Sequence, residues 1–252
     1  MVNKIIVTAL NDEANPIIKF YNLSRDTRHS DLKVYINDNY SLLITGVGRK
    51  KVMDTLPNYL NRINTAKSLL FKVGIAGANP ASAKIGDLYY IDKLCSVFNN
   101  QEYEFPVIDN IAIPNIGLIT VDKKIDKYEN NLYKELVDME ASVITDIALE
   151  YFELSKIRIL KVVSDYMDIV DWSNLNIREL INLNIDPITY FIDINQWNIV
   201  YSKRIVTLFN NSLAFSCSNR FSGIASGSNE GSLSMMVFKS SSNSSRFPSF
   251  VW

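Results

Sequence analysis

The chain has 252 residues, of which 47% are hydrophobic and 21% are charged, the composition of an ordinary globular protein. Its formal net charge is −1, which gives no electrostatic reason to expect nucleic acid or an anionic membrane as a partner. No apolar run approaches the roughly 18 residues needed to cross a bilayer, and the first apolar run is too short for a signal peptide. We therefore expect a cytoplasmic protein.

Seven short apolar runs are typical of β-strands. In chain order they are Lys4–Ala9, Leu32–Ile36, Leu42–Thr45, Leu69–Val73, Leu88–Ile91, Gly117–Thr120 and Ile157–Val163. Most are apolar on both faces, which indicates strands that are covered by helices on both sides. The segments with helical spacing are Asn11–Tyr21, Lys50–Ile63, Asp138–Phe152 and a helix pair over Leu175–Ile194 that is interrupted at Pro187. This alternation predicts a three-layer α/β/α domain.

The C-terminal part of the chain has a different composition. Fourteen of residues 212–252 are Ser, and little helical spacing remains there. We expect one working domain over residues 1–203 and a weakly ordered Ser-rich segment over residues 204–252. The alternative is that aromatic residues of this segment dock on the domain or on a second subunit.

The first candidate for chemistry is Glu13, which follows the first predicted strand and begins a helix. Open α/β sheets bind ligands at the carboxyl ends of their strands, so a catalytic role is one interpretation. The other is structural, because acidic residues favour helix N-termini through the helix dipole. The sequence alone leaves both open.

Two glycine-rich turns follow later strands. Thr45-Gly46-Val47-Gly48-Arg49 and Val73-Gly74-Ile75-Ala76-Gly77 both allow tight turns and a close backbone approach to a ligand. The first turn lacks the third glycine of the dinucleotide fingerprint, so we expect no nucleotide cofactor. Each turn is equally consistent with packing alone.

Two more carboxylates occupy comparable positions. Glu140 begins a predicted helix, and Ser164-Asp165 ends the last predicted strand. Cleaving a nucleoside requires an acid for the leaving base, a group that activates water, and a polar hold on the ribose hydroxyls. Glu13, Glu140 and Asp165 could supply these three roles.

These motifs, in this order, resemble the nucleoside phosphorylase superfamily, most of all its 5′-methylthioadenosine/S-adenosylhomocysteine nucleosidase branch. The resemblance covers roughly residues 4–200, and its most specific motifs are Asp138-Met139-Glu140-Ala141 and Val163-Ser164-Asp165. It implies a central mixed, mostly parallel sheet, a homodimer and no cofactor.

The resemblance also implies individual roles. Glu13 matches the carboxylate that orients or deprotonates the attacking water. Glu140, after Met139, matches the residue that binds the ribose hydroxyls. Asp165 matches the acid that protonates the purine at N7, with Ser164 orienting its carboxyl group. Ile75 and Gly77 occupy the strand-end turn that faces the nucleophile.

The sequence departs from the family pattern at three places, one of which is the segment between Ile91 and Gly117, where no clear match to the substrate-side loop is found. Ile75 stands where nucleosidases often carry Ser or Thr, and the segment Val121–Ile125 offers no aromatic ring to stack on a purine. We expect hydrolysis of a purine nucleoside, a small-molecule substrate, with release of the free base. Two alternatives remain: phosphorolysis, in which phosphate replaces water, and a nucleoside-binding module without catalysis.

Other chemistry-bearing residues suggest no site. The single histidine, His29, lies among charged residues, and a solvated loop is expected there. One histidine and two distant cysteines argue against a zinc site, so no metal is expected. The cysteine pattern favours a reducing compartment, although one disulfide stays possible. Trp172, Trp197 and Trp252 are expected in the core or at partner contacts.

Overall fold

The computed structural model describes residues 3–106, 108, 112–125, 132–168 and 175–194. The Ser-rich segment over residues 204–252 and all three tryptophans lie outside these ranges, so the expectations for them stay predictions. Within the described part of the chain, no helix has the length and apolar character to cross a membrane.

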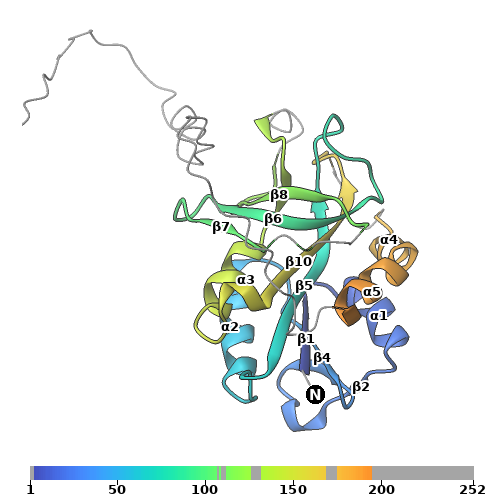
Figure 1. Cartoon of the computed structure of the whole chain (residues 1–252), viewed down its shortest axis with the longest axis vertical. Coiled ribbons are helices and arrows are strands. Elements are labelled where there is room, and N and C mark those ends of the chain that lie inside the picture. Colours follow the sequence, from blue (N-terminus) through green and yellow to red (C-terminus); the bar gives the residue numbers. More distant parts are fainter. Residues whose placement is uncertain (1–2, 107, 109–111, 126–131, 169–174, 195–252) are drawn as a thin grey trace, which may run out of the picture. The chain divides into compact units, whose positions relative to one another are not determined.

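The described strands form one ten-stranded mixed sheet, ordered β10-β6-β8-β9-β5-β1-β4-β3-β2, with β7 beside β6 and an additional pairing of β10 with β5 (Figure 1). The strands are β1 (Asn3–Thr8), β2 (Ser24–Arg25), β3 (Lys33–Ile36), β4 (Tyr40–Ile44), β5 (Ser68–Gly77), β6 (Leu88–Ser96), β7 (Glu102–Glu104), β8 (Asn115–Thr120), β9 (Leu136–Asp138) and β10 (Ile157–Asp165). All seven predicted strands are present, and the prediction of a mixed sheet is confirmed.

Over the described residues, the parallel pairings hold most of the paired positions of the sheet. The run β4-β1-β5-β10 is parallel throughout, but five of the ten pairings are antiparallel. The short connection between β3 and β4 can join only antiparallel strands. The short strands β2, β7 and β9 add three further antiparallel pairs. The parallel run nevertheless brings the carboxyl ends of β1, β5 and β10 to one edge.

In the described ranges, five α-helices accompany the sheet: α1 (Asn11–Phe20), α2 (Arg49–Leu60), α3 (Ala141–Ala148), α4 (Ile177–Leu183) and α5 (Ile185–Ile194). Short 3₁₀ turns occur at Thr27–His29 and Leu154–Lys156. Helices α1, α4 and α5 contact one another, as do α2 and α3. Figure 1 shows these two groups on opposite sides of β1 and β5. The continuous burial of β10 agrees with the apolar run seen in the sequence.

Two predicted helices have different limits. The segment Leu136–Asp138 is strand β9, and α3 starts only at Ala141. Asp138 accounts for the difference because its carboxylate accepts the Ala141 N–H at 3.0 Å and the Thr120 hydroxyl of the neighbouring strand at 2.7 Å. The helix pair breaks at Asn184 and not at Pro187, which lies in the first turn of α5. A proline is tolerated there because the N–H groups of the first helical turn have no intrahelical acceptors, so the missing N–H of proline costs no helical hydrogen bond.

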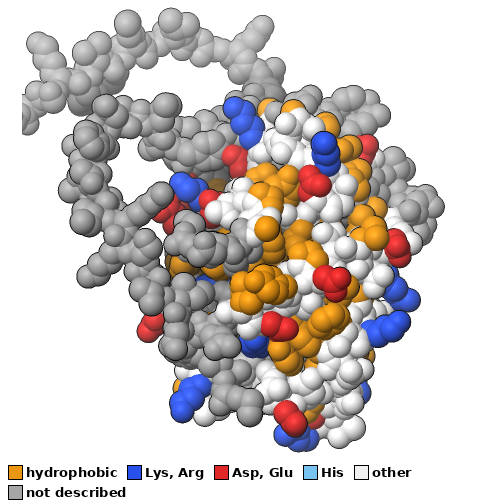
Figure 2. Space-filling view, turned by 45° about the vertical axis from the view of Figure 1, so that its right-hand side comes forward, with side chains coloured by type: hydrophobic (Ala, Val, Ile, Leu, Met, Phe, Trp, Pro, Cys, Tyr) orange, Lys and Arg blue, Asp and Glu red, His pale blue; other side chains and the backbone are white. Residues whose placement is uncertain are grey.

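The side of the domain that carries α1, α4 and α5 comes forward in Figure 2, where hydrophobic side chains gather between scattered charges. Exposed hydrophobic residues on these helices are Phe20, Leu183, Tyr190 and Ile194. Isolated exposed apolar side chains are normal on soluble proteins. The candidate site residues lie elsewhere, at the carboxyl ends of the parallel strands.

Candidate active site

A cavity of about 560 Å³ lies at the carboxyl ends of β1, β5 and β10, beside the starts of α1 and α3. The carboxyl edge of parallel strands is where open α/β sheets bind ligands. All seven residues singled out in the sequence line this cavity: Glu13, Ile75, Gly77, Met139, Glu140, Ser164 and Asp165. The structure therefore brings them together, while the roles assigned to them stay predictions.

Glu13 is held by the turn between β1 and α1 and by β5. Its Oε2 accepts the N–H groups of Ala9 at 2.7 Å and Leu10 at 3.0 Å, and its Oε1 accepts the N–H of Ile75 at 3.0 Å. The side chain is 2% exposed. The two interpretations of Glu13 are thus compatible: it caps the turn before α1, and its carboxyl group lies against the cavity.

Gly74 allows this approach of Glu13 to β5. A Cβ atom at position 74 would lie 2.7 Å from Glu13 Oε1 and 2.9 Å from Lys72 Nζ. No side chain fits at those distances without moving Glu13. The segment Val73–Gly77, predicted as a turn, is the last part of strand β5, and the close approach of a carboxylate explains its Gly74.

Glu140 occupies the position just before α3. Its Oε1 accepts the N–H of Gly48 at 2.7 Å, and Gly48 in turn precedes the first residue of α2 with a φ of 87°. This bond joins the first glycine turn to the start of α3. Burial raises the pKa of Glu140, and the neighbouring Asp138 raises it further, while Lys72 and Lys161 act in the opposite direction.

Asp165 is presented by an irregularity at the end of β10. The register with β5 shifts between Val163 and Asp165, so the usual alternation of side chains is broken and both Ser164 and Asp165 line the cavity. Ser164 Oγ lies 2.5 Å from Asp165 Oδ2, and Met167 donates its N–H to Oδ1 at 2.8 Å. A Cβ at Gly77 would lie 2.7 Å from the Met167 side chain, so this turn requires the glycine.

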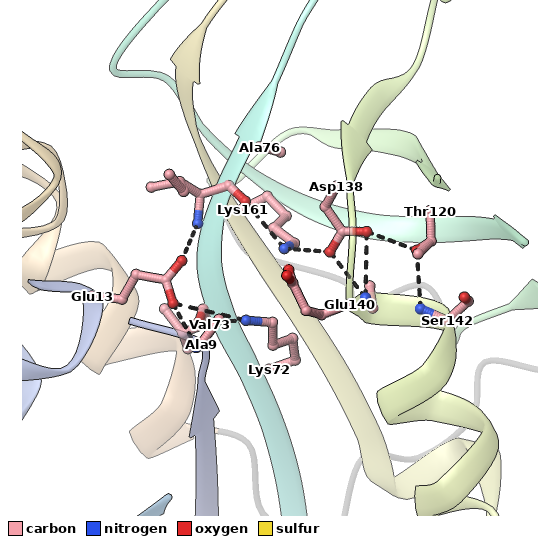
Figure 3. A network of polar contacts seen from close by, with 12 residues as sticks. Ala9, Glu13, Lys72, Val73, Ala76, Thr120, Asp138, Glu140, Ser142 and Lys161 are labelled. Atoms are coloured by element: carbon pink, nitrogen blue, oxygen red, sulfur yellow. Dashed lines mark hydrogen bonds and ion pairs between the residues drawn. The ribbon is translucent and has the colours of Figure 1, made fainter. Parts of the chain in front are cut away.

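A buried network beside the cavity was missed by sequence reasoning (Figure 3). Lys161 Nζ donates to Asp138 Oδ2 at 2.7 Å and to the Ile75 carbonyl at 3.2 Å. Burial alone would lower the pKa of Lys161, but the carboxylates of Asp138, Glu13 and Glu140 raise it above its ordinary value. Lys72 lies next to this group, with Nζ 3.9 Å from Glu13 Oε2. A signal was present, since lysines interrupt two otherwise apolar strands.

The rest of the cavity wall is mostly apolar. It includes Leu10, Val47, Val121, Ile125, Met167 and Ile177. Among the described residues that line the cavity, none is aromatic, which agrees with the absence of an aromatic ring in Val121–Ile125. A mostly apolar cavity with a few convergent polar groups is typical of a small-molecule site.

His29 lies elsewhere, and the expectation of a solvated loop for it is wrong. The imidazole is buried, with Nδ1 2.9 Å from Asp26 Oδ2 and its ring edge-on to Tyr59 at 5.5 Å between centroids. Charged neighbours in sequence suggested exposure, but the Asp26 carboxylate satisfies the ring inside the fold. His29 does not line the cavity.

Solved structures show where this architecture occurs among known proteins. A putative 5′-methylthioadenosine/S-adenosylhomocysteine nucleosidase from Francisella philomiragia aligns with a TM-score of 0.62 at 15% identity, over 77% of this chain and 100% of its own. The Helicobacter pylori 5′-methylthioadenosine/S-adenosylhomocysteine nucleosidase, with butyl-thio-DADMe-Immucillin-A, gives 0.60 at 13% identity, over 77% and 99%. The chain has the nucleoside phosphorylase fold.

Other comparisons set the limits of this likeness. The futalosine hydrolase of Helicobacter pylori aligns with a TM-score of 0.59 at 14% identity, over 77% of this chain and 98% of its own. No family model matches the sequence, and no curated protein matches it. Nucleosidases with different substrates thus share the nucleoside phosphorylase fold with this chain, so the substrate has to be argued from the cavity itself.

Proposed function

We propose that the protein hydrolyses the N-glycosidic bond of a purine nucleoside of the 5′-methylthioadenosine/S-adenosylhomocysteine type. The observation that carries the proposal is the convergence of Glu13, Glu140 and Asp165 on one apolar cavity. The three carboxylates come from different turns, and each is fixed by backbone N–H groups. The nucleosidases that share the fold make this reaction class the first to test.

We propose a separate step for each carboxylate. Asp165, oriented by Ser164, delivers a proton to the purine as the bond to the sugar breaks. Glu140, after Met139, accepts hydrogen bonds from the ribose hydroxyls, which strengthen as positive charge develops on the ring. Glu13 orients the attacking water and accepts its proton, and the end of β5 at residues 75–77 forms the adjacent wall.

Water is favoured over phosphate as the nucleophile. The carboxylates facing the cavity would repel an anion, and the Ile75 side chain offers no hydroxyl to bind one. Lys72 and Lys161 are buried beside carboxylates and do not line the cavity. Arg49, the candidate anion ligand near the first glycine turn, lies over the Phe98 ring at 4.8 Å. Phosphorolysis remains the second candidate through Lys124, which lines the cavity, and through Arg49.

A nucleoside-binding module without catalysis is the non-enzymatic alternative. The apolar Ile75 side chain and the lack of an aromatic ring among the described cavity residues favour it. The presence of all three carboxylates in the cavity argues against it.

We further propose that the protein has a three-layer α/β/α arrangement, forms a homodimer and is located in the cytoplasm.

A base-release assay over a nucleoside panel tests the proposal. Purified protein is incubated with 5′-methylthioadenosine, S-adenosylhomocysteine, adenosine, inosine and futalosine, with and without phosphate. We expect free base from a 5′-thio-substituted adenosine without any need for phosphate. Ribose 1-phosphate as the sugar product would favour phosphorolysis, and binding without substrate loss over hours at high protein concentration would favour the binding module.

A further inference from the structure

Lys72 is a buried cation whose partners leave its role open. It stands in the apolar strand β5 and is 0% exposed. Its Nζ lies 3.9 Å from Glu13 Oε2 and 3.4 Å from the Val73 carbonyl. Lys161, by contrast, donates to Asp138 at 2.7 Å. Burying an ammonium group is unfavourable unless charges nearby compensate, so the surroundings of Lys72 indicate what it does.

Charged groups face Lys72 from four neighbouring elements. Glu13 faces it from α1, Asp138 from β9, Glu140 from the start of α3, and Lys161 from β10. Figure 3 shows the Lys72 ammonium between the carboxyl groups of Glu13 and Glu140. Burial lowers the pKa of Lys72 and Lys161 lowers it further, while the three carboxylates oppose them.

The space under the cavity is shaped for this lysine. Only a glycine at position 74 leaves room for both groups, because a Cβ there would lie 2.9 Å from Lys72 Nζ and 2.7 Å from Glu13 Oε1. Lys72 does not line the cavity. It can therefore act on a bound molecule only through the carboxylates above it.

We propose that Lys72 is a positioning residue whose ammonium group, lying between Glu13 and Glu140, allows both carboxylates to be ionised at the same time. This rests on the proposed function, in which Glu13 orients water and Glu140 accepts ribose hydrogen bonds. Two carboxylates in one dry site repel each other, and without a cation one of them takes up a proton. Lys72 thereby widens the pH range in which the pair is fully charged.

The pH profile of kcat/KM separates this role from simple packing. Its acid limb reports a carboxylate that must be ionised. Removing the cation raises the pKa of that carboxylate, so the limb moves to higher pH. For Lys72→Met, which keeps the length of the side chain without its charge, we expect a shift of about 1 pH unit or more. At a pH on that limb, kcat/KM falls about tenfold and recovers as the pH rises.

Two variants serve as controls. Lys4→Met removes a buried lysine from the adjacent strand β1, where Lys4 pairs with Asp193 away from the cavity. Its profile should coincide with that of the unaltered protein. Lys72→Arg keeps the charge and should keep the acid limb in place. If the limbs of Lys72→Met and the unaltered protein coincide, the proposal is wrong.

A direct titration decides the matter without catalysis. Carbon-13 NMR of labelled glutamate carboxyl groups follows Glu13 and Glu140 in the unliganded protein, with Glu13→Gln and Glu140→Gln providing assignments. We expect the Glu140 signal to titrate at higher pH in Lys72→Met, because Lys72 lowers the pKa of Glu140 in the unaltered protein. If that variant does not fold, Glu140 is compared in Glu13→Gln and in Glu13→Gln/Lys72→Met, where it should again titrate higher in the double variant.

These two experiments fail differently. If the unaltered protein releases no base from any nucleoside, the proposed function is wrong, and the NMR titration still tests Lys72. If base is released but the Glu140 titration does not change on removal of Lys72, the nucleosidase proposal stands and the role of Lys72 is refuted.

Discussion

The two ends of strand β1 carry charged clusters that are organised in opposite ways. At its start, Lys4 and the hydroxyls of Tyr21 and Tyr40 all surround Asp193. At its other end, Glu13, Asp138, Glu140 and Asp165 outnumber Lys72 and Lys161 beside a cavity.

The first cluster is fully paired. Burial and Asp193 raise the pKa values of both tyrosines, so they stay neutral donors, and their rings stack at 4.0 Å. One cation and two neutral donors satisfy one carboxylate. Such an arrangement stabilises the fold and leaves nothing free to react.

Among the described residues that line the cavity beside the second cluster, five are acidic and one, Lys124, is basic. Structural ion pairs also perturb pKa values, so perturbation alone does not mark a site. An excess of acidic groups that faces an apolar cavity is a better mark of a site, because such groups can stabilise a positively charged transition state. Variants of the two clusters test this difference.

The largest effect is expected for Asp165→Asn. An amide cannot deliver the proton that the departing purine needs, and losing a general acid commonly lowers turnover by about 10²–10⁴-fold. Steady-state base release should show this loss in kcat, while equilibrium binding of the nucleoside stays largely intact. Near-normal kcat in the variant would remove Asp165 from the mechanism.

Glu140→Gln should have a smaller effect, on binding and on turnover together. Losing a charged acceptor for the ribose hydroxyls should lower kcat/KM by about 10–100-fold. The unaltered protein should also cleave ribosides faster than 2′-deoxyribosides. Equal rates on the two sugars would contradict the ribose role.

Glu140→Gln should also flatten the dependence of stability on pH. The pKa of Glu140 is raised in the folded state, so its contribution to stability is fully present below the ordinary carboxyl pKa. That contribution is lost as the pH rises through the raised value. We expect thermal unfolding, measured across this pH window, to show this loss of stability in the unaltered protein and not in Glu140→Gln.

Gly74→Ala should disturb the site through geometry alone. The new Cβ would meet Glu13 Oε1 at 2.7 Å, where the Ile75 N–H holds that oxygen. We expect a loss of stability of about 1–3 kcal/mol. We also expect about a tenfold fall in kcat/KM, less than the ~10² that an ångström of misplacement can cause.

Gly117→Ala is the matched control for Gly74→Ala. Its Cβ would approach the Glu135 side chain at 3.0 Å, but Gly117 lies in β8 and does not line the cavity. This variant should keep its activity. If the two alanine variants lose activity equally, the close approach at Gly74 has no special role.

The smallest effect is expected at the other end of β1. Lys4→Met removes one partner of Asp193, and the loss of about 1 kcal/mol would lower the melting temperature by about 2–4 °C. Turnover should be unchanged because the cluster does not line the cavity. A clear fall in kcat in this variant would contradict the division between the two clusters.

Sequence reasoning succeeded where a local signal was strong. Strands β1, β5 and β10 are mostly apolar runs, and the carboxylates at their ends could be placed at one edge by topology alone. Strand β9 was absorbed into a predicted helix because it has only three residues and no period of its own. Its identity depends on the bond between Asp138 and Thr120, two residues far apart in sequence.

The buried network could be predicted only in part. Lys72 and Lys161 stand out as charges within apolar strands, which indicates that each needs a buried partner. The partners themselves depend on which turns meet, and the joining of Glu140 to Gly48 arises only in the folded chain. Likewise, nothing local predicted that His29 would be buried by Asp26 and Tyr59.

The most direct test of the account is turnover of 5′-methylthioadenosine in oxygen-18 water. Mass spectrometry of the sugar product follows the label in the unaltered protein and in Asp165→Asn. The account predicts free adenine and a pentose that carries oxygen-18 at the anomeric carbon, with both products nearly absent in the variant. An unlabelled sugar phosphate, or no release of base from any nucleoside, would contradict it.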